Sequence, residues 1–107
     1  MDDKDIIYAY DTVTLAAEAL FRTGENAINT KAKLEAARLE ALMTGVIVGK
    51  NADEREANAR EALKPLFDKL AVYQEQERKA RYDFDQAMRN VEKVRSLLRL
   101  MEITSKI

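Results

Sequence analysis

The chain lacks cysteine and histidine altogether, and it contains few residues that interrupt a helix. Without cysteine it has neither disulfides nor thiolate metal sites. Without histidine it lacks the usual general base, the di-iron ligand set of helical bundles and HExxH zinc chemistry. One proline, three glycines and no tryptophan among 107 residues favour long helices over strands and turns. We therefore expect a helical protein that is not an enzyme and that binds no metal or cofactor.

Signals for membranes and phosphate groups are also missing. The apolar runs are only a few residues long, whereas a helix that spans a bilayer needs about 20. The N-terminus, Met1-Asp2-Asp3-Lys4-Asp5, is acidic where a secretory signal would be basic and then apolar. Gly45, Gly49 and Lys50 fall one residue short of the P-loop spacing. These features predict a cytoplasmic protein without a membrane partner.

A regular apolar repeat fills the C-terminal half of the chain. Its steps alternate between four and three residues over six heptads, and only one position, Glu77, is neither apolar nor aromatic. A repeat that averages 3.5 residues keeps one seam on one side of a helix and favours supercoiling against another helix. The seam consists of Ala59, Leu63, Leu66, Leu70, Tyr73, Glu77, Ala80, Phe84, Ala87, Val91, Val94, Leu98 and Met101.

The N-terminal half also has helical periodicity, from about residue 6 to residue 48. Its expected inward residues are Val13, Ala16, Ala17, Leu20 and Phe21, followed by Ile28, Ala32, Leu39, Leu42 and Val46. Gly24 either ends a separate N-terminal helix as its C′ residue or lies inside one continuous helix. The sequence leaves both alternatives open.

Between the two halves, the residues 49–51 carry the signals of a tight turn. Gly49 suits the C′ position of a helix that ends near Val48. Asn51 suits the N-cap of a helix that begins at Ala52, with Glu54 at N3 as in a capping box. Such a short connection predicts that the two helices lie antiparallel.

The second arm, expected over 52–101, contains the only proline. Pro65 lacks the N–H that would bond back toward Glu61, and its ring clashes with the preceding turn. We expect either a kink near 61–64 or a separate short helix over 52–63. The heptad phase is unbroken across Pro65, and this favours the kink. Residues 1–5 and 103–107 are expected to fray.

Together these patterns predict one all-α domain over residues 1–107, a long antiparallel helical hairpin of coiled-coil type. Apolar residues lie beside the predicted stripes, and a hairpin alone would leave them exposed. A second copy would cover them, most simply in a twofold four-helix bundle, so we expect a homo-oligomer, with a dimer favoured. The alternative is a monomer that folds back at Gly24 into a three-helix bundle. The flanking residues are Leu15, Phe21, Met43, Phe67, Met88 and Leu97.

Two polar features of the C-terminal half allow more than one interpretation. Glu77 in the seam either fixes register or oligomer state, or points past the edge toward Arg78, Arg81 or a basic residue on the other arm. Residues 78–107 carry eight basic and four acidic groups, although the whole chain has a net charge of −1. This face is a solvated surface with interspersed acids, or it forms ion pairs with Glu35, Glu18 and Asp11 of the first arm. The alternative is a nucleic-acid site, in which aromatic rings stack on bases. The residues in question are Arg78, Arg81, Arg89, Arg95, Tyr73 and Tyr82.

The turn also carries a resemblance. Gly49-Lys50-Asn51, followed after three residues by Arg55, resembles the turn of small phage or prophage helical-hairpin proteins of uncharacterised function. The resemblance implies a viral or prophage origin, hence the host cell cytoplasm, and marks these four residues. From the residues alone, we interpret them as a turn, a cap and an arginine that reaches back to the carbonyls ending the first arm.

These observations lead to two hypotheses of function. The first is a non-enzymatic phage-type accessory protein that acts through self-association and through binding to an unknown protein partner. The second is a nucleic-acid-associated module for phage recombination or replication, which would use the basic face of the C-terminal helix.

Overall fold

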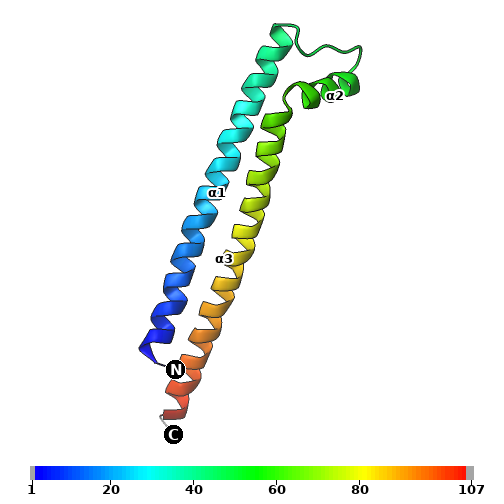
Figure 1. Cartoon of the computed structure of the whole chain (residues 1–107). Helices are drawn as coiled ribbons and strands as arrows, with labels where there is room; N and C mark the ends of the chain where they lie inside the picture. The colour runs from blue at the N-terminus through cyan, green and yellow to red at the C-terminus, as the bar shows by residue number, and fades with distance from the viewer. Residues whose placement is uncertain (1, 106–107) are drawn as a thin grey trace. The chain divides into compact units, whose positions relative to one another are not determined.

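A computed structural model describes residues 2–105, and every regular element in that range is a helix (Figure 1). The helices are α1 (Asp3–Met43), α2 (Ala52–Ala62) and α3 (Lys64–Ser105). One compact unit combines the chain up to Arg22 with the chain from Arg78 onward, and a second unit is Thr23–Glu77. In each unit a segment of α1 packs antiparallel against a segment of α3. The predicted all-α helical hairpin is confirmed.

Helix α1 continues through Gly24 without a break. Gly24 is half-buried, and a Cβ atom built on it would lie 2.9 Å from Oε2 of Glu77. The helix tolerates this glycine because a glycine inside a helix costs only about 1 kcal/mol relative to alanine. Of the two alternatives, the continuous helix is therefore the one observed, and the separate N-terminal helix of a three-helix bundle is not.

The inward side of α1 is lined mainly by small residues. Its positions repeat at three- and four-residue steps, and each is buried or half-buried. Small side chains allow α1 to approach α3 closely, since interiors are packed without gaps. The inward residues are Ile6, Ala9, Val13, Ala16, Leu20, Thr23, Ala27, Thr30, Leu34, Ala37 and Ala41.

This stripe corrects the prediction for the first arm. Val13, Ala16 and Leu20 face inward as expected. The other predicted residues are exposed, because the stripe of larger apolar residues lies outside the hairpin seam. The exposed residues are Ala17, Phe21, Ile28, Ala32, Leu39, Leu42 and Val46.

The heptad seam predicted for the second arm is confirmed along almost its whole length. Every seam residue from Ala59 to Leu98 is buried or half-buried, whereas Met101 is 49% exposed. In the first unit Ala9 of α1 packs with Val91 and Val94. In the second unit Ala41 packs with Ala59 and with the loop residue Ile47.

The first arm ends five residues earlier than predicted, at Met43. Gly45 adopts a left-handed φ of 77°, and the N–H groups of Val46 and Ile47 both donate to the Ala41 carbonyl. Gly45 therefore takes the helix-ending role that was assigned to Gly49. The connection extends over residues 44–51, so the prediction of a three-residue turn at 49–51 was wrong.

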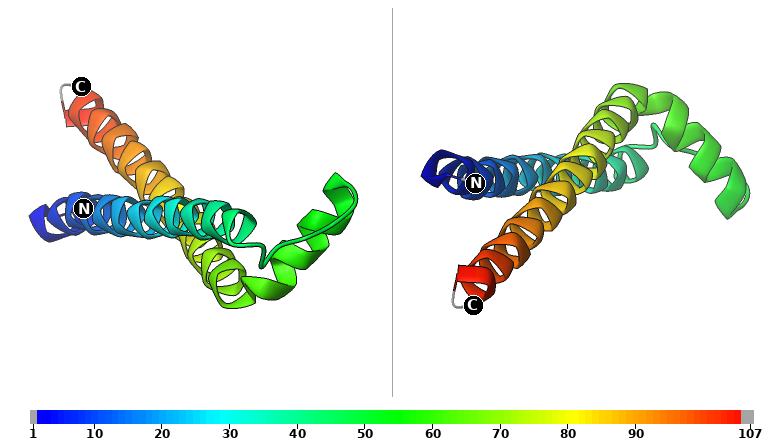
Figure 2. Two further views of the ribbon diagram at one scale, coloured as in Figure 1. Left: turned by 90° about the horizontal axis from the view of Figure 1, so that it is seen from above. Right: turned by 90° about the horizontal axis from the view of Figure 1, so that it is seen from below.

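The second arm is divided at Leu63, which has φ −112° and ψ 23° and separates α2 from α3. Pro65 lies in the first turn of α3, where a missing N–H removes no helical hydrogen bond. The separate short helix is thus observed in place of the favoured kink within one helix, and it ends one residue earlier than expected. Figure 2 shows α2 turning away from the line of the first turns of α3.

The ends of the helices also differ from the predicted fraying. Helix α1 already begins at Asp3, where the carboxylate of Asp2 accepts a hydrogen bond from the N–H of Asp5 at 3.1 Å. Helix α3 continues past Met101 to Ser105. The predictions for residue 1 and for residues 106–107 lie outside the described residues.

Candidate protein-binding surfaces

The residues of the G-K-N-x3-R turn hold the start of α2 in place. Asn51 is the N-cap as predicted, and its Oδ1 accepts a hydrogen bond from the Glu54 N–H at 2.8 Å. The Glu54 carboxylate accepts from the Lys50 N–H at 3.3 Å, so the reciprocal bond falls one residue before the cap. Arg55 donates from Nη1 to the Gly49 carbonyl at 3.3 Å. The carbonyl that Arg55 reaches therefore belongs to the loop and not to the end of α1.

Gly49 is required by close packing rather than by an unusual backbone angle. A Cβ atom at this position would lie 2.7 Å from the backbone N and 2.8 Å from Cγ of Arg55. Asn58 of α2 also donates from Nδ2 to the Val48 carbonyl, which fastens the same loop. The contacts assign Gly49, Asn51 and Arg55 a structural role in the connection.

A cluster of ion pairs and cation–π contacts links α2 to α1, and it was not predicted from the sequence. Arg38 of α1 forms an ion pair with Glu56, whose other oxygen lies 3.3 Å from Nε of Arg60. The guanidinium carbons of Arg38 and Arg60 lie 5.7 Å and 5.0 Å from the centre of the Phe67 ring. Phe67, predicted to widen the exposed stripe, is instead half-buried beneath these two arginines.

A groove of about 200 Å³ lies beside this cluster, lined by residues that include Arg38, Ile47, Arg55 and Glu56. Pockets for small molecules usually enclose about 300–1,000 Å³. The two arginines already bond to Glu56 and to the Gly49 carbonyl. The polar groups of the groove thus link α2 to α1 and to the loop.

Glu77 lies in the hairpin seam, as its sequence position predicted, and is half-buried. Its Oε2 occupies the space above Gly24 that a larger residue would fill. The carboxylate therefore faces α1 and not Arg78 or Arg81. The glycine and the glutamate form one complementary layer of the seam.

The four arginines proposed for nucleic acid, Arg78, Arg81, Arg89 and Arg95, are all exposed. Arg95 donates from Nε to the Tyr10 hydroxyl at 3.2 Å, and this hydrogen bond raises the pKa of the guanidinium above its ordinary value. Arg95 thus stays charged at any pH at which the protein would be handled.

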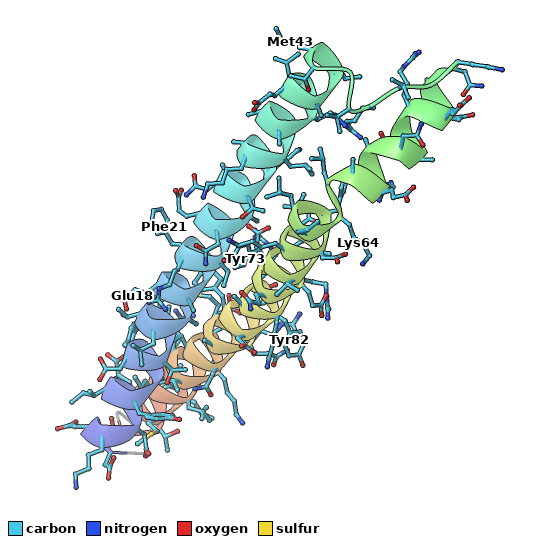
Figure 3. The ribbon with its side chains drawn as sticks, turned by 45° about the horizontal axis from the view of Figure 1, so that its top comes forward. Glu18, Phe21, Met43, Lys64, Tyr73 and Tyr82 are labelled. Carbon is cyan, nitrogen blue, oxygen red and sulfur yellow. The ribbon has the colours of Figure 1, made fainter. Side chains whose placement is uncertain are left out.

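The neighbours of these arginines favour the solvated-face interpretation. The carboxylates of Asp85 and Glu92 are exposed on the same stretch of α3. Tyr73 is half-buried in the seam, with Nζ of Lys69 at 5.7 Å from its ring centre, so its ring is not free to stack on a base. Tyr82 is exposed and projects away from α1 (Figure 3).

Large apolar side chains are exposed along both long helices. Phe21 is 71% exposed and lies on the side of α1 that faces away from α3 (Figure 3). Leu15 and Met43 are also exposed, as predicted, while Met88 and Leu97 are exposed by little more than a third. Further exposed residues of this kind on α1 are Ile7, Tyr8, Tyr10, Ile28, Leu39 and Leu42, and on α3 Val72, Leu100, Met101 and Ile103.

Within residues 2–105, no three carboxylates come close enough together to hold a metal ion. None of the helices in this range combines the length and the apolar character that crossing a bilayer requires.

Comparisons with protein-family models, with curated proteins and with solved structures found no match for this chain.

Proposed function

We propose that this chain is a non-enzymatic accessory protein of phage type that self-associates and acts by binding a protein partner in the host cytoplasm. One observation carries the proposal. The hairpin seam buries the small residues of α1, such as Ala27 and Ala41, and leaves large ones such as Phe21 and Leu39 exposed.

The thin core of the hairpin supports the proposal. The buried apolar residues are mostly alanine and valine, and no large side chain among the described residues is fully buried. Small domains gain little stability from one such core and often need oligomerisation to add more. Soluble monomers also rarely expose many large apolar side chains on one side. A second protein surface over these residues would supply the missing burial.

The test is light scattering coupled to size-exclusion chromatography at micromolar concentrations, combined with thermal unfolding at several protein concentrations. Self-association predicts a mass above that of one 12.2 kDa chain and a Tm that rises with concentration. A constant monomer mass together with a Tm that does not depend on concentration would refute the proposal.

The nucleic-acid alternative rests on the exposed arginines of α3. It has less support from the geometry, because acidic groups are interspersed with them and one of the two candidate stacking rings is packed in the seam.

A further inference from the structure

Helix α1 has a second apolar repeat outside the hairpin seam, within the unit Thr23–Glu77. We call it the outer stripe, and it consists of Ile28, Ala32, Glu35, Leu39 and Leu42. Its steps are four, three, four and three residues, which is the spacing of a coiled-coil seam. All five residues are exposed. The inward residues of the same helix segment, in contrast, are buried or half-buried against the hairpin.

We propose that the outer stripe is the contact surface for a second copy of this chain, paired antiparallel about a twofold axis near Glu35. The inference rests on the self-association proposed above and specifies which surface carries it.

The stripe is complementary to itself under this symmetry. An antiparallel pairing about Glu35 sets Ile28 level with Leu42 of the second copy and brings Ala32 within one residue of the level of Leu39 of the second copy. The small Ala32 then lies opposite the larger Leu39, and Ile28 lies opposite Leu42, so that apolar residues meet apolar residues across the axis. Because a twofold interface uses the same surface on both chains, one stripe of this kind is sufficient.

The exposed area also matches what a dimer needs. Ile28, Leu39 and Leu42 are 63%, 61% and 43% exposed, and the adjacent Met43 is 79% exposed. Side chains of this size offer on the order of 100 Å² of apolar surface each. With Ala32 they supply roughly 400–500 Å², and a standard interface buries about 800 Å² per partner, a little over half of it apolar.

Glu35 gives the proposed dimer surface a specific, testable property. It is the one charged residue of the outer stripe, and the twofold axis would bring two copies of its carboxylate together. Like charges in a seam weaken association, while a polar residue there selects one register. Association through this surface is therefore weaker than its apolar residues alone would allow, and removal of the charge strengthens it.

The experiment measures the dimer dissociation constant of four full-length proteins by sedimentation equilibrium: wild type, Glu35→Leu, Leu39→Glu and Val72→Glu. Val72 is the matched control, because it is 54% exposed and lies in the same unit, but on α3. We expect Glu35→Leu to bind itself at least about 10-fold more tightly and Leu39→Glu at least about 100-fold more weakly. Val72→Glu should stay within about threefold of wild type.

The outcomes separate this inference from the function on which it rests. A wild-type protein that is monomeric at every concentration overturns both. A wild-type dimer that Leu39→Glu leaves intact, or that Leu39→Glu and Val72→Glu weaken equally, overturns only the outer stripe. Tighter association of Glu35→Leu supports the stripe when the species formed is a dimer and no larger, because misfolding would instead produce larger aggregates. Far-ultraviolet circular dichroism confirms that the variants, all changed at exposed positions, keep their helices.

Discussion

At the scale of single residues, the two glycines of the connection between α1 and α2 have different structural roles. Gly45 has a left-handed φ of 77°, and a Cβ atom placed on it would meet nothing within 4 Å. A Cβ atom at Gly49, in contrast, would collide with the backbone of Arg55. Asparagine tolerates the left-handed region. One substitution therefore distinguishes the two positions.

We predict that Gly45→Asn changes the free energy of unfolding by less than about 0.5 kcal/mol, while Gly49→Asn lowers it by about 1–3 kcal/mol. The loss at Gly49 arises because the start of α2 must move to admit the new side chain. Urea unfolding measures both, and hydrogen exchange in α2 locates the effect. Equal losses at the two positions would show that the close approach of Gly49 to Arg55 does not matter.

The layer formed by Gly24 and Glu77 gives a second prediction at this scale. Gly24→Ala should stabilise the helix by about 1 kcal/mol when Glu77 is also alanine, since only helix propensity then changes. With Glu77 present the gain should be smaller, because the carboxylate must leave the position 2.9 Å from the new Cβ.

A double-mutant cycle in chemical denaturation measures this coupling. An identical gain from Gly24→Ala in both backgrounds would mean that the two residues do not form a packed layer.

At the scale of elements, truncation distinguishes the residues of α1 that pack in the hairpin seam from those that are exposed. Leu34 is 7% exposed in the hairpin seam, whereas Leu15 on the same helix is 66% exposed. Leu34→Ala should lower the free energy of unfolding by about 2–3 kcal/mol, because it opens a cavity in the seam. Leu15→Ala should stay within about 0.5 kcal/mol. Thermal and urea unfolding measure both losses, and a larger loss at Leu15 than at Leu34 would contradict the assignment of Leu34 to the seam.

The inward residues of α3 are larger than those of α1, and this difference explains which of the two inward stripes could be predicted from the sequence. The seam of α3 was predictable because large residues such as Leu70, Phe84 and Val91 occupy heptad positions. The inward stripe of α1 was missed beyond Leu20, because alanine and threonine give a weak hydrophobic signal. The stripe of larger residues on the outside, including Ile28 and Leu39, is more conspicuous in the sequence than the one that packs against α3.

The connection was mispredicted for a local reason. Val46, Ile47 and Val48 continue the apolar pattern, but the left-handed Gly45 ends the helix before them and Ile47 turns in to pack against Ala41. The N-cap at Asn51 was predictable because it depends only on neighbours in the chain. The ion pair of Arg38 with Glu56 was not, because it depends on the path of the loop.

At the scale of the whole molecule, the net charge of −1 and the interspersed acids on α3 bear on the nucleic-acid alternative. We predict no gel shift with single- or double-stranded DNA at low salt, since phosphate binding needs a coherent basic surface. A shift that disappears when Arg78, Arg81, Arg89 and Arg95 are changed to glutamate would instead establish that alternative.

The central claim is that large apolar residues lie outside the hairpin seam because another copy of the chain covers them. Sedimentation equilibrium of the wild-type protein over a wide concentration range tests it most directly. The account predicts a mass that rises from 12.2 kDa toward twice that value as the concentration increases. A mass that stays at one chain up to the highest soluble concentration would contradict it.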